Sequence, residues 1–131
     1  MFPFTSKEVE KKEQECPLNR ETLGSATWSL LHTMGLAYPD KPSPEYQAKT
    51  RVFMETLALL YPCGHCAEDF QKEVAKSPPR VSSRTSLSMW LCEQHNLVSV
   101  KLNKPTFECT MEKLEERWWT GKPGCHEGDD A

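Results

Sequence analysis

The sequence predicts an all-α protein, a four-helix bundle with a short fifth helix. Three observations lead to this fold class. Apolar residues recur at steps of three and four, which is the period of an α-helix. Prolines and capping residues divide the chain into segments of helical length. No stretch alternates apolar and polar residues over enough positions to indicate a β-strand.

A single domain accounts for most of the 131 residues. A chain of this length has room for one modest hydrophobic core, so no second domain is expected. Between residues 5 and 15 only Val9 is apolar, which predicts a flexible polar N-terminal tail over residues 1–15. Residues 16–125 form the predicted domain, and residues 126–131 form an acidic C-terminal tail.

The first two helices are predicted over about residues 19–37 and 44–60. Helical spacing in the first is carried by Leu23, Thr27, Leu30, Met34 and Ala37. Three prolines in residues 38–44 end it, and Ser43 followed by Pro44 caps the second helix. The predicted buried stripe of the second helix consists of Phe53, Leu57 and Leu60.

The remaining helices follow two further breaks in the chain. Pro62 interrupts the second helix, and a third is predicted over about residues 64–76. Ser83 or Thr85 can cap a fourth helix, which ends before Lys104-Pro105. One face of this fourth helix carries Leu87, Leu91, Val98 and Leu102. The short fifth helix is indicated by Met111, Leu114 and Trp118.

Charge and composition exclude several functional classes. The net charge is −3 and basic residues are interspersed with acidic ones, unlike the basic footprint of a nucleic-acid-binding protein. No apolar run approaches the roughly 20 residues that span a bilayer, so no membrane span is expected. Six cysteines exceed ordinary usage, and the even number suits an oxidising compartment or a cysteine-based chemistry.

The segment Cys63-Gly64-His65-Cys66 carries the strongest chemical signal. A cysteine pair at the start of a helix suits a redox dithiol, because the helix dipole stabilises a thiolate there. The same spacing could supply two of four zinc ligands. Cys92 and Cys109 form no second close pair, so the spacing favours redox chemistry over zinc. A thioredoxin-type motif would require flanking βαβ patterns, which are missing.

The other four cysteines divide into an inner and an outer set. Cys92 lies on the fourth helix and Cys109 at the head of the fifth, where a disulfide would staple the connection and stabilise the fold by about 3 kcal/mol. Cys16 and Cys125 lie at the ends of the domain. They could be free thiols, an intrachain clasp or a bridge between subunits, and spacing does not choose among these.

Two helices carry residues suited to a flat, charged ligand. Trp28 and His32 lie one turn apart on the first helix, between Gly24 and Gly35. Polar and basic groups on or after the fourth helix suit a nucleotide, namely His95, Asn96, Ser99, Lys101 and Lys104. The plain alternatives are a core histidine and a solvated helix face. A glycine-rich phosphate loop is missing, so side chains and helix faces would have to hold any nucleotide.

Taken in order, these segments resemble the Erv family of FAD-linked sulfhydryl oxidases, and within it the short, core-domain forms. The resemblance runs from Cys16 to Cys125. Its central pieces are Tyr61-Pro62-Cys63 with Cys66-Ala67-Glu68-Asp69, and Trp90-Leu91-Cys92 with His95-Asn96. The flanking pieces are Cys16-Pro17, Leu23-Gly24, Thr27-Trp28, Leu31-His32-Thr33, Tyr38-Pro39-Asp40, Lys101-Leu102, Lys104-Pro105, Phe107, Cys109 and Glu116-Arg117-Trp118.

The resemblance implies FAD at the mouth of the bundle and a catalytic Cys63–Cys66 pair. By position, Cys66 would face the flavin and Cys63 would be the sulfur that a substrate thiolate attacks. The implied cofactor-binding residues are Arg20, Gly24, Trp28, His32, Tyr61, His95, Asn96, Val98, Lys101, Lys104 and Trp118. Cys92 and Cys109 match a structural disulfide, and Cys16 and Cys125 match cysteines that bridge a head-to-tail homodimer. No metal is implied.

The chain departs from the family pattern at a few positions. Ser25 stands where arginine is usual, Ser99 where asparagine is usual, and Asn103 where glycine is usual. No further Cys-x-x-Cys precedes Cys16, unlike the long forms with a shuttle pair, which is the reason for expecting a core domain or short form. The stretch from Cys109 to Trp118 is also longer than in the family and the tail after it is shorter, which affects the alignment of residues 117–119.

These observations lead to a functional hypothesis and to its rivals. The expected enzyme passes electrons from substrate dithiols through Cys63 and Cys66 to FAD, then to oxygen or cytochrome c. The resemblance implies a Mia-type import oxidoreductase as substrate and the mitochondrial intermembrane space as location, with a cytosolic or secreted short form as alternative. The main rival is a non-enzymatic, disulfide- or zinc-stabilised signalling or binding module. A cysteine hydrolase using Cys63 with His65 is disfavoured, since neighbouring positions rarely give triad geometry.

Overall fold

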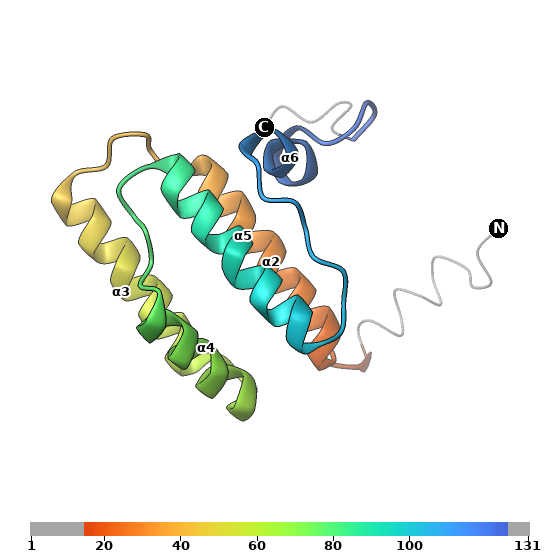
Figure 1. Ribbon diagram of the computed structural model, residues 1–131. Coiled ribbons are helices and arrows are strands. Elements are labelled where there is room, and N and C mark those ends of the chain that lie inside the picture. Colours follow the sequence, from red (N-terminus) through yellow and green to blue (C-terminus); the bar gives the residue numbers. More distant parts are fainter. Residues whose placement is uncertain (1–14, 126–131) are drawn as a thin grey trace.

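The computed structural model describes residues 15–125, and all regular structure in this range is helical (Figure 1). The elements are α2 (Arg20–Ala37), α3 (Pro44–Leu60), α4 (Gly64–Lys76), α5 (Arg84–Lys101), α6 (Met111–Glu115) and the π-helical turn η1 (Glu116–Thr120). The predicted all-α class, with four main helices and a short fifth, is confirmed. The predicted tails at residues 1–14 and 126–131 lie outside the described residues.

Side-chain caps fix where most of the helices begin. Asn19 accepts a hydrogen bond from the Thr22 amide at the start of α2. Ser43 and Ser83 cap α3 and α5 in the same way, and Thr110 caps α6. Each cap satisfies a backbone N–H that has no partner inside the helix. The start of α4 differs, because its N-cap residue Cys63 makes no side-chain cap hydrogen bond.

The four main helices pack as two pairs, α2 beside α5 and α3 beside α4 (Figure 1). Gly35 allows the first pair to approach closely, since a Cβ there would lie 2.9 Å from Leu91 Cδ1 and 3.4 Å from Ser88 Cα. One buried cluster joins the two pairs. Its members are Leu31, Tyr38, Met54, Ala58, Val74, Val81, Leu87, Trp90 and Leu91.

The buried face of α3 is not the predicted one. Phe53 is 41% exposed and Leu60 is 70% exposed, whereas Met54 and Ala58 are fully buried. Both the predicted stripe and the observed one have the spacing of a single helix face, but the observed buried face is displaced by one residue along the sequence from the predicted one. Periodicity identified the helix correctly, but α3 is apolar on more than one face and its packing partner decides which face is covered.

The same one-residue rotation occurs in α2. Leu30, which carried the helical period, is 58% exposed, and its neighbours Leu31 and His32 are buried. On α5 the prediction fails only at the end, where Leu87 and Leu91 are buried and Leu102 is 58% exposed. The C-terminal end of the predicted face of α5 extends beyond the bundle core.

The end of α5 explains one departure from the family pattern. Asn103 has φ of 55°, in the left-handed region that glycine adopts without strain. Asparagine is the side chain that tolerates this conformation best after glycine. The amides of Leu102 and Lys104 both donate to the Ser99 carbonyl, so the turn is complete. Asparagine therefore serves in place of glycine here.

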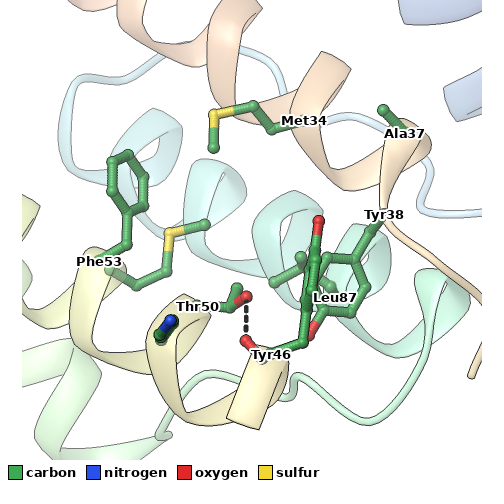
Figure 2. Close-up of a pocket in the computed structure, with 9 residues that line it drawn as sticks. Met34, Ala37, Tyr38, Tyr46, Thr50, Phe53 and Leu87 are labelled. Atoms are coloured by element: carbon green, nitrogen blue, oxygen red, sulfur yellow. Dashed lines mark hydrogen bonds between the residues drawn. The ribbon is translucent and has the colours of Figure 1, made fainter. Parts of the chain in front are cut away.

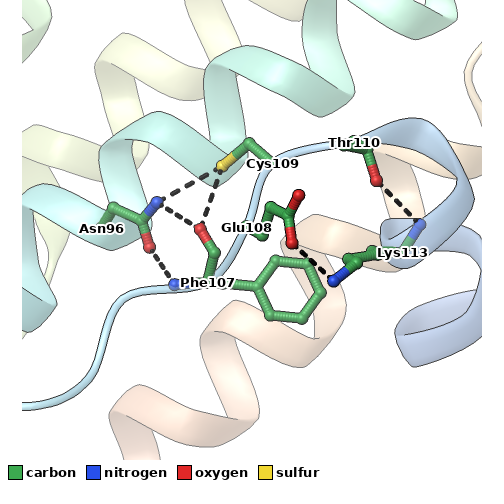
Figure 3. A network of polar contacts seen from close by, with 6 residues as sticks. All are labelled: Asn96, Phe107, Glu108, Cys109, Thr110 and Lys113. Atoms are coloured by element: carbon green, nitrogen blue, oxygen red, sulfur yellow. Dashed lines mark hydrogen bonds and ion pairs between the residues drawn. The ribbon is translucent and has the colours of Figure 1, made fainter.

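The segment between α5 and α6 is fastened to α5 at two points. A disulfide joins Cys92 to Cys109, with a Cα–Cα distance of 5.9 Å. Asn96 brackets the backbone of Phe107, donating to its carbonyl at 2.8 Å and accepting from its amide at 2.8 Å (Figure 3). These contacts lie beside a second buried cluster of Leu36, Cys92 and Leu114. The segment is thereby fixed where it can deliver the last helix to α2.

The predicted fifth helix is two structures in succession. Residues 111–115 are α-helical, and residues 116–120 form a π-helical turn that packs against α2. Leu114 is buried as expected, and the turn ends at Gly121, whose φ is 70°. The wider turn sets the register of Trp118, and such turns often accompany functional sites. Among residues 15–125 no helix is long and apolar enough to cross a membrane.

Candidate functional site

The cysteine pair occupies the junction between α3 and α4. Cys63 is the N-cap of α4 and Cys66 lies in its first turn, and the two form a disulfide with a Cα–Cα distance of 5.2 Å. Cys63 is buried at 8% exposure, whereas Cys66 is half-buried. Because no side chain caps α4, its first N–H groups and the positive end of its dipole remain available to a thiolate. This environment favours thiol–disulfide exchange.

The imidazole of His65 lies beside the Cys63–Cys66 disulfide, close to both sulfurs. Its Nδ1 is 3.7 Å from Cys63 Sγ, and its Nε2 is 3.7 Å from Cys66 Sγ. The imidazole itself is exposed. Within the part of the chain that the structure describes, these three residues are the one group of cysteine, histidine and carboxylate side chains close enough to share a metal ion.

A row of aromatic and imidazole rings connects α2, α5 and η1. Trp28 stacks on His95 with ring centroids 4.3 Å apart and planes 4° from parallel. His32 stacks on Trp118 at 4.6 Å, with planes 15° apart. The two stacks are joined by a hydrogen bond of 2.8 Å between His32 Nε2 and His95 Nδ1. Four residues predicted separately as ligand-binding thus form one continuous row.

Phe70 connects this row to the cysteine pair. It follows Cys66 by four residues on α4, so the two side chains share a helix face. Its ring meets Trp28 edge-on, with centroids 6.5 Å apart. A second connection is made by Tyr61, whose hydroxyl would lie 3.7 Å from a Cβ at Gly24. The site is therefore one surface that extends from the disulfide to η1.

Both histidines of the row are held in the uncharged state. Burial lowers the pKa of His32 to about 3, and the nearby His95 and Arg117 lower it further. Burial also lowers the pKa of His95 to about 4, with additional effects from Arg117 and Lys104. At neutral pH the row consequently presents neutral hydrogen-bonding rings, which suit a flat heteroaromatic ligand.

Acidification is expected to destabilise the fold through these two histidines. In the unfolded chain they take up protons near pH 6.5, so between about pH 6.5 and about 4 the unfolded state binds more protons. With the pKa of His32 lowered to about 3 and that of His95 to about 4, the free energy of unfolding should fall by at most about 5 kcal/mol over this range, and by less to the extent that solvent screens the half-buried His95. Urea unfolding across it, followed by helical circular dichroism, measures the effect. His32→Gln should flatten the pH dependence, and an unchanged slope in this variant would contradict the assignment.

Among the remaining predicted ligand-binding residues, Lys104 lies close enough to His95 to lower the pKa of that imidazole. Lys101 pairs with Glu73 at 3.4 Å and Lys104 with Glu21 at 3.2 Å, and both lysines are about half exposed. Arg20 is exposed and Val98 is half-buried. Asn96 is occupied by the Phe107 backbone, so in this structure it positions the 104–110 segment.

Two neighbours of the row escaped the sequence analysis. Phe70 lies one turn after Cys66 on α4, so the sequence could have placed it near the cysteine pair. It was missed because an aromatic residue on an amphipathic helix is ordinarily assigned to the hydrophobic core. The Arg117 guanidinium lies 3.8 Å over the Trp118 ring, a cation–π contact that depends on the π-helical register. No helical periodicity would have predicted that register.

A cavity lies elsewhere, between α2, α3 and α5 (Figure 2). It has a volume of about 380 Å³, and none of the predicted site residues lines it. Apolar side chains dominate its wall, among them Met34, Phe53 and Leu87. No cysteine, histidine or carboxylate lines it, in contrast to the group formed by Cys63, His65 and Cys66.

Comparison with known proteins identifies the family of this chain. The family model described as Erv1 / Alr matches residues 25–119. The chain is similar to the mitochondrial FAD-linked sulfhydryl oxidase ERV1 of Saccharomyces cerevisiae, with 39% identity over 105 residues, 80% of this chain and 54% of the relative. It is also similar to the FAD-linked sulfhydryl oxidase ERV1 of Oryza sativa subsp. japonica, with 40% identity over 121 residues, 92% of this chain and 60% of the relative. The chain thus spans little more than half the length of these relatives.

Solved structures share the fold. The crystal structure of the yeast Erv1 core superposes with a TM-score of 0.77 and 39% identity, covering 81% of this chain and 88% of that one. The crystal structure of the FAD binding domain of Erv1 from Saccharomyces cerevisiae gives a TM-score of 0.74 and 38% identity, covering 79% and 96%. The helical arrangement and the sequence agree over the same part of the chain.

Proposed function

The chain belongs to the Erv1 / Alr family, and on this basis we propose that it is an FAD-dependent thiol oxidase that generates disulfide bonds. One observation carries the proposal. The Cys63–Cys66 disulfide at the uncapped start of α4 is linked through Phe70 to the Trp28–His95 stack. An exchangeable disulfide and a surface for a flat cofactor thus adjoin each other.

The residues of the row fit FAD. Trp28 and Trp118 offer ring faces for stacking, and the neutral imidazoles of His32 and His95 offer hydrogen bonds without charge. The cationic groups suited to the phosphates are Arg20, Lys101, Lys104 and Arg117. Gly24, Tyr61 and Val98 complete the proposed cofactor surface, with Asn96 holding its edge. When bound, FAD supplies an acceptor for the two electrons of the reduced cysteine pair.

The proposed reaction of the protein itself is a disulfide exchange. A substrate thiolate attacks Cys63 Sγ, the Cys63–Cys66 bond breaks, and Cys66 leaves as a thiolate that the start of α4 stabilises. The second substrate thiolate then attacks the mixed disulfide and releases Cys63. The substrate dithiol loses two electrons and becomes a disulfide, while the cysteine pair gains them. Cys66 is the more exposed sulfur in this structure, so the order of attack has to be tested on single-cysteine variants.

A visible absorption spectrum tests the proposal directly. The purified protein is expected to show a flavin spectrum that bleaches when dithiothreitol is added and recovers in air. Bleaching requires electrons to pass from the dithiol through the cysteine pair, and recovery requires an oxidant such as oxygen. A colourless protein that contains zinc would contradict it and would favour a disulfide- or zinc-stabilised binding module instead.

Partners and location form a finer part of the proposal. We propose a Mia-type import oxidoreductase as the thiol substrate and oxygen or cytochrome c as the electron acceptor. The mitochondrial intermembrane space is the proposed location, supported by two relatives whose names describe them as mitochondrial. Within the family we propose a relation to short forms such as that of augmenter of liver regeneration, supported by the order of motifs from Cys16 to Cys109.

A homodimer bridged by Cys16 and Cys125 is also proposed. Both residues are exposed, and neither is paired within the described chain. Large apolar side chains are exposed on α2 and α3, including Leu30, Phe53 and Leu60, as expected of a surface that a second copy covers. Electrophoresis without reductant should show a dimer that reductant converts to monomer. A monomer under both conditions would contradict the bridge.

A further inference from the structure

The group formed by Cys63, His65 and Cys66 has the composition of a metal site. Its three candidate ligand atoms all lie within 4.8 Å of one another. Two thiolates and one imidazole are the ligands that zinc and similar borderline-soft ions prefer. Disulfide exchange requires the two sulfurs and does not require the imidazole, so the placement of His65 calls for a separate explanation.

The distances agree with a tetrahedral ion bound to all three residues. Zinc bonds of about 2.3 Å to sulfur and about 2.0–2.1 Å to nitrogen place sulfur and nitrogen about 3.6 Å apart at a tetrahedral angle. His65 Nε2 lies 3.7 Å from Cys66 Sγ and 3.9 Å from Cys63 Sγ. One nitrogen is therefore already nearly equidistant from both sulfurs at close to the required separation. Only the sulfurs, bonded to each other here, have to separate.

We propose that the reduced form of this chain binds one Zn²⁺ through Cys63, Cys66 and His65, leaving a fourth position open. Both thiols lose their protons to the solvent when the ion binds, and no electrons are transferred. The disulfide form lacks thiolates and does not bind. Because the imidazole is exposed, the open position faces solvent and can take water or the thiolate of a substrate.

Metal binding and disulfide formation consequently exclude each other. A thiolate whose lone pair is bound to zinc is a poor nucleophile and electron donor, so the ion would hold the pair in its reduced state. This regulatory consequence rests on the proposed oxidase function. The site itself requires only that the Cys63–Cys66 disulfide can be reduced.

The test is a zinc titration of the full chain as purified. The protein is reduced with a phosphine under nitrogen, the phosphine is removed, and Zn²⁺ is added in competition with a chromophoric chelator. We expect one ion per chain in the reduced protein and none in the oxidised protein. Co²⁺ in place of Zn²⁺ should give the thiolate charge-transfer and visible bands of a tetrahedral sulfur site.

Variants assign the ligands. His65→Gln should weaken zinc binding by about 10–100-fold, since even groups that only orient a metal ligand contribute that much. Cys125→Ser removes an exposed free thiol and should leave the affinity unchanged. Equal affinity in the His65→Gln variant, or equal binding by the oxidised chain, would overturn the site. The readout is independent of flavin and oxidase activity, so a colourless protein that still binds zinc would refute only the proposed function.

Discussion

Replacing Cys66 by serine is expected to abolish thiol oxidase turnover while the flavin stays bound. A hydroxyl cannot form the disulfide or leave as a stable anion, and Cys66 is the one cysteine that pairs with Cys63 in the structure. Turnover should fall by at least about 10³-fold, as when a covalent catalyst without a substitute is removed. The flavin spectrum should persist, because the rings proposed to hold the cofactor are untouched. Oxygen consumption with dithiothreitol and the absorption spectrum measure the two effects.

Two further serine variants make this result specific. Cys63→Ser should be equally inactive. In a background that also lacks the exposed thiols of Cys16 and Cys125, the Cys63 thiol of Cys66→Ser should form a mixed disulfide with an aromatic disulfide reagent faster than the Cys66 thiol of Cys63→Ser does. Cys125→Ser changes an exposed cysteine outside the pair and should keep its turnover. Substantial turnover in Cys66→Ser would refute the relay. A faster reaction in Cys63→Ser would reverse the roles of the two sulfurs.

The helix boundaries could be predicted because their causes are local. Ser43 with Pro44, Ser83 and the breaks after residues 37 and 76 act within one turn of the chain, and the structure places helix ends at these positions. Caps and prolines need no information from the rest of the molecule. The disulfide between Cys92 and Cys109 could also be predicted, because one cysteine lies on the fourth helix and the other at the start of the fifth, so that the bond closes the connection between them.

The buried faces could not be predicted in the same way, because a partner helix determines them. On α3, Met54 and Ala58 are covered by the bundle while Phe53 is exposed, although each set has helical spacing. The π-helical register of residues 116–120 likewise follows from packing on α2. Both are tertiary effects that override the local pattern.

The candidate site falls between these cases. The cysteine pair follows from spacing alone, whereas the residues of the ring row were assigned largely by resemblance. That Trp28, His32, His95 and Trp118 stack as one unit became visible only with α2, α5 and η1 in place. Phe70 was missed because its contact with Trp28 spans two helices distant in sequence. Cofactor binding by this row stays a prediction until flavin content is measured on its variants.

Replacing Trp90 by alanine is expected to have the largest effect on stability. The side chain is fully buried in the cluster that joins the two helix pairs, and its indole N–H donates to the Ser77 carbonyl at 2.9 Å. Truncation leaves a large cavity and deprives that carbonyl of its donor, so the free energy of unfolding should fall by about 4 kcal/mol. This is a large share of the roughly 5–15 kcal/mol that stabilises a typical domain. The midpoint of urea unfolding, followed by helical circular dichroism, measures it.

Two matched variants separate the causes of this loss. Trp90→Phe keeps most of the volume and loses the indole hydrogen bond, so it should cost about 1–2 kcal/mol. Trp119→Ala removes the same kind of side chain where it is 50% exposed, and should cost less than about 1 kcal/mol. If alanine at position 90 costs no more than alanine at position 119, Trp90 does not join the helix pairs.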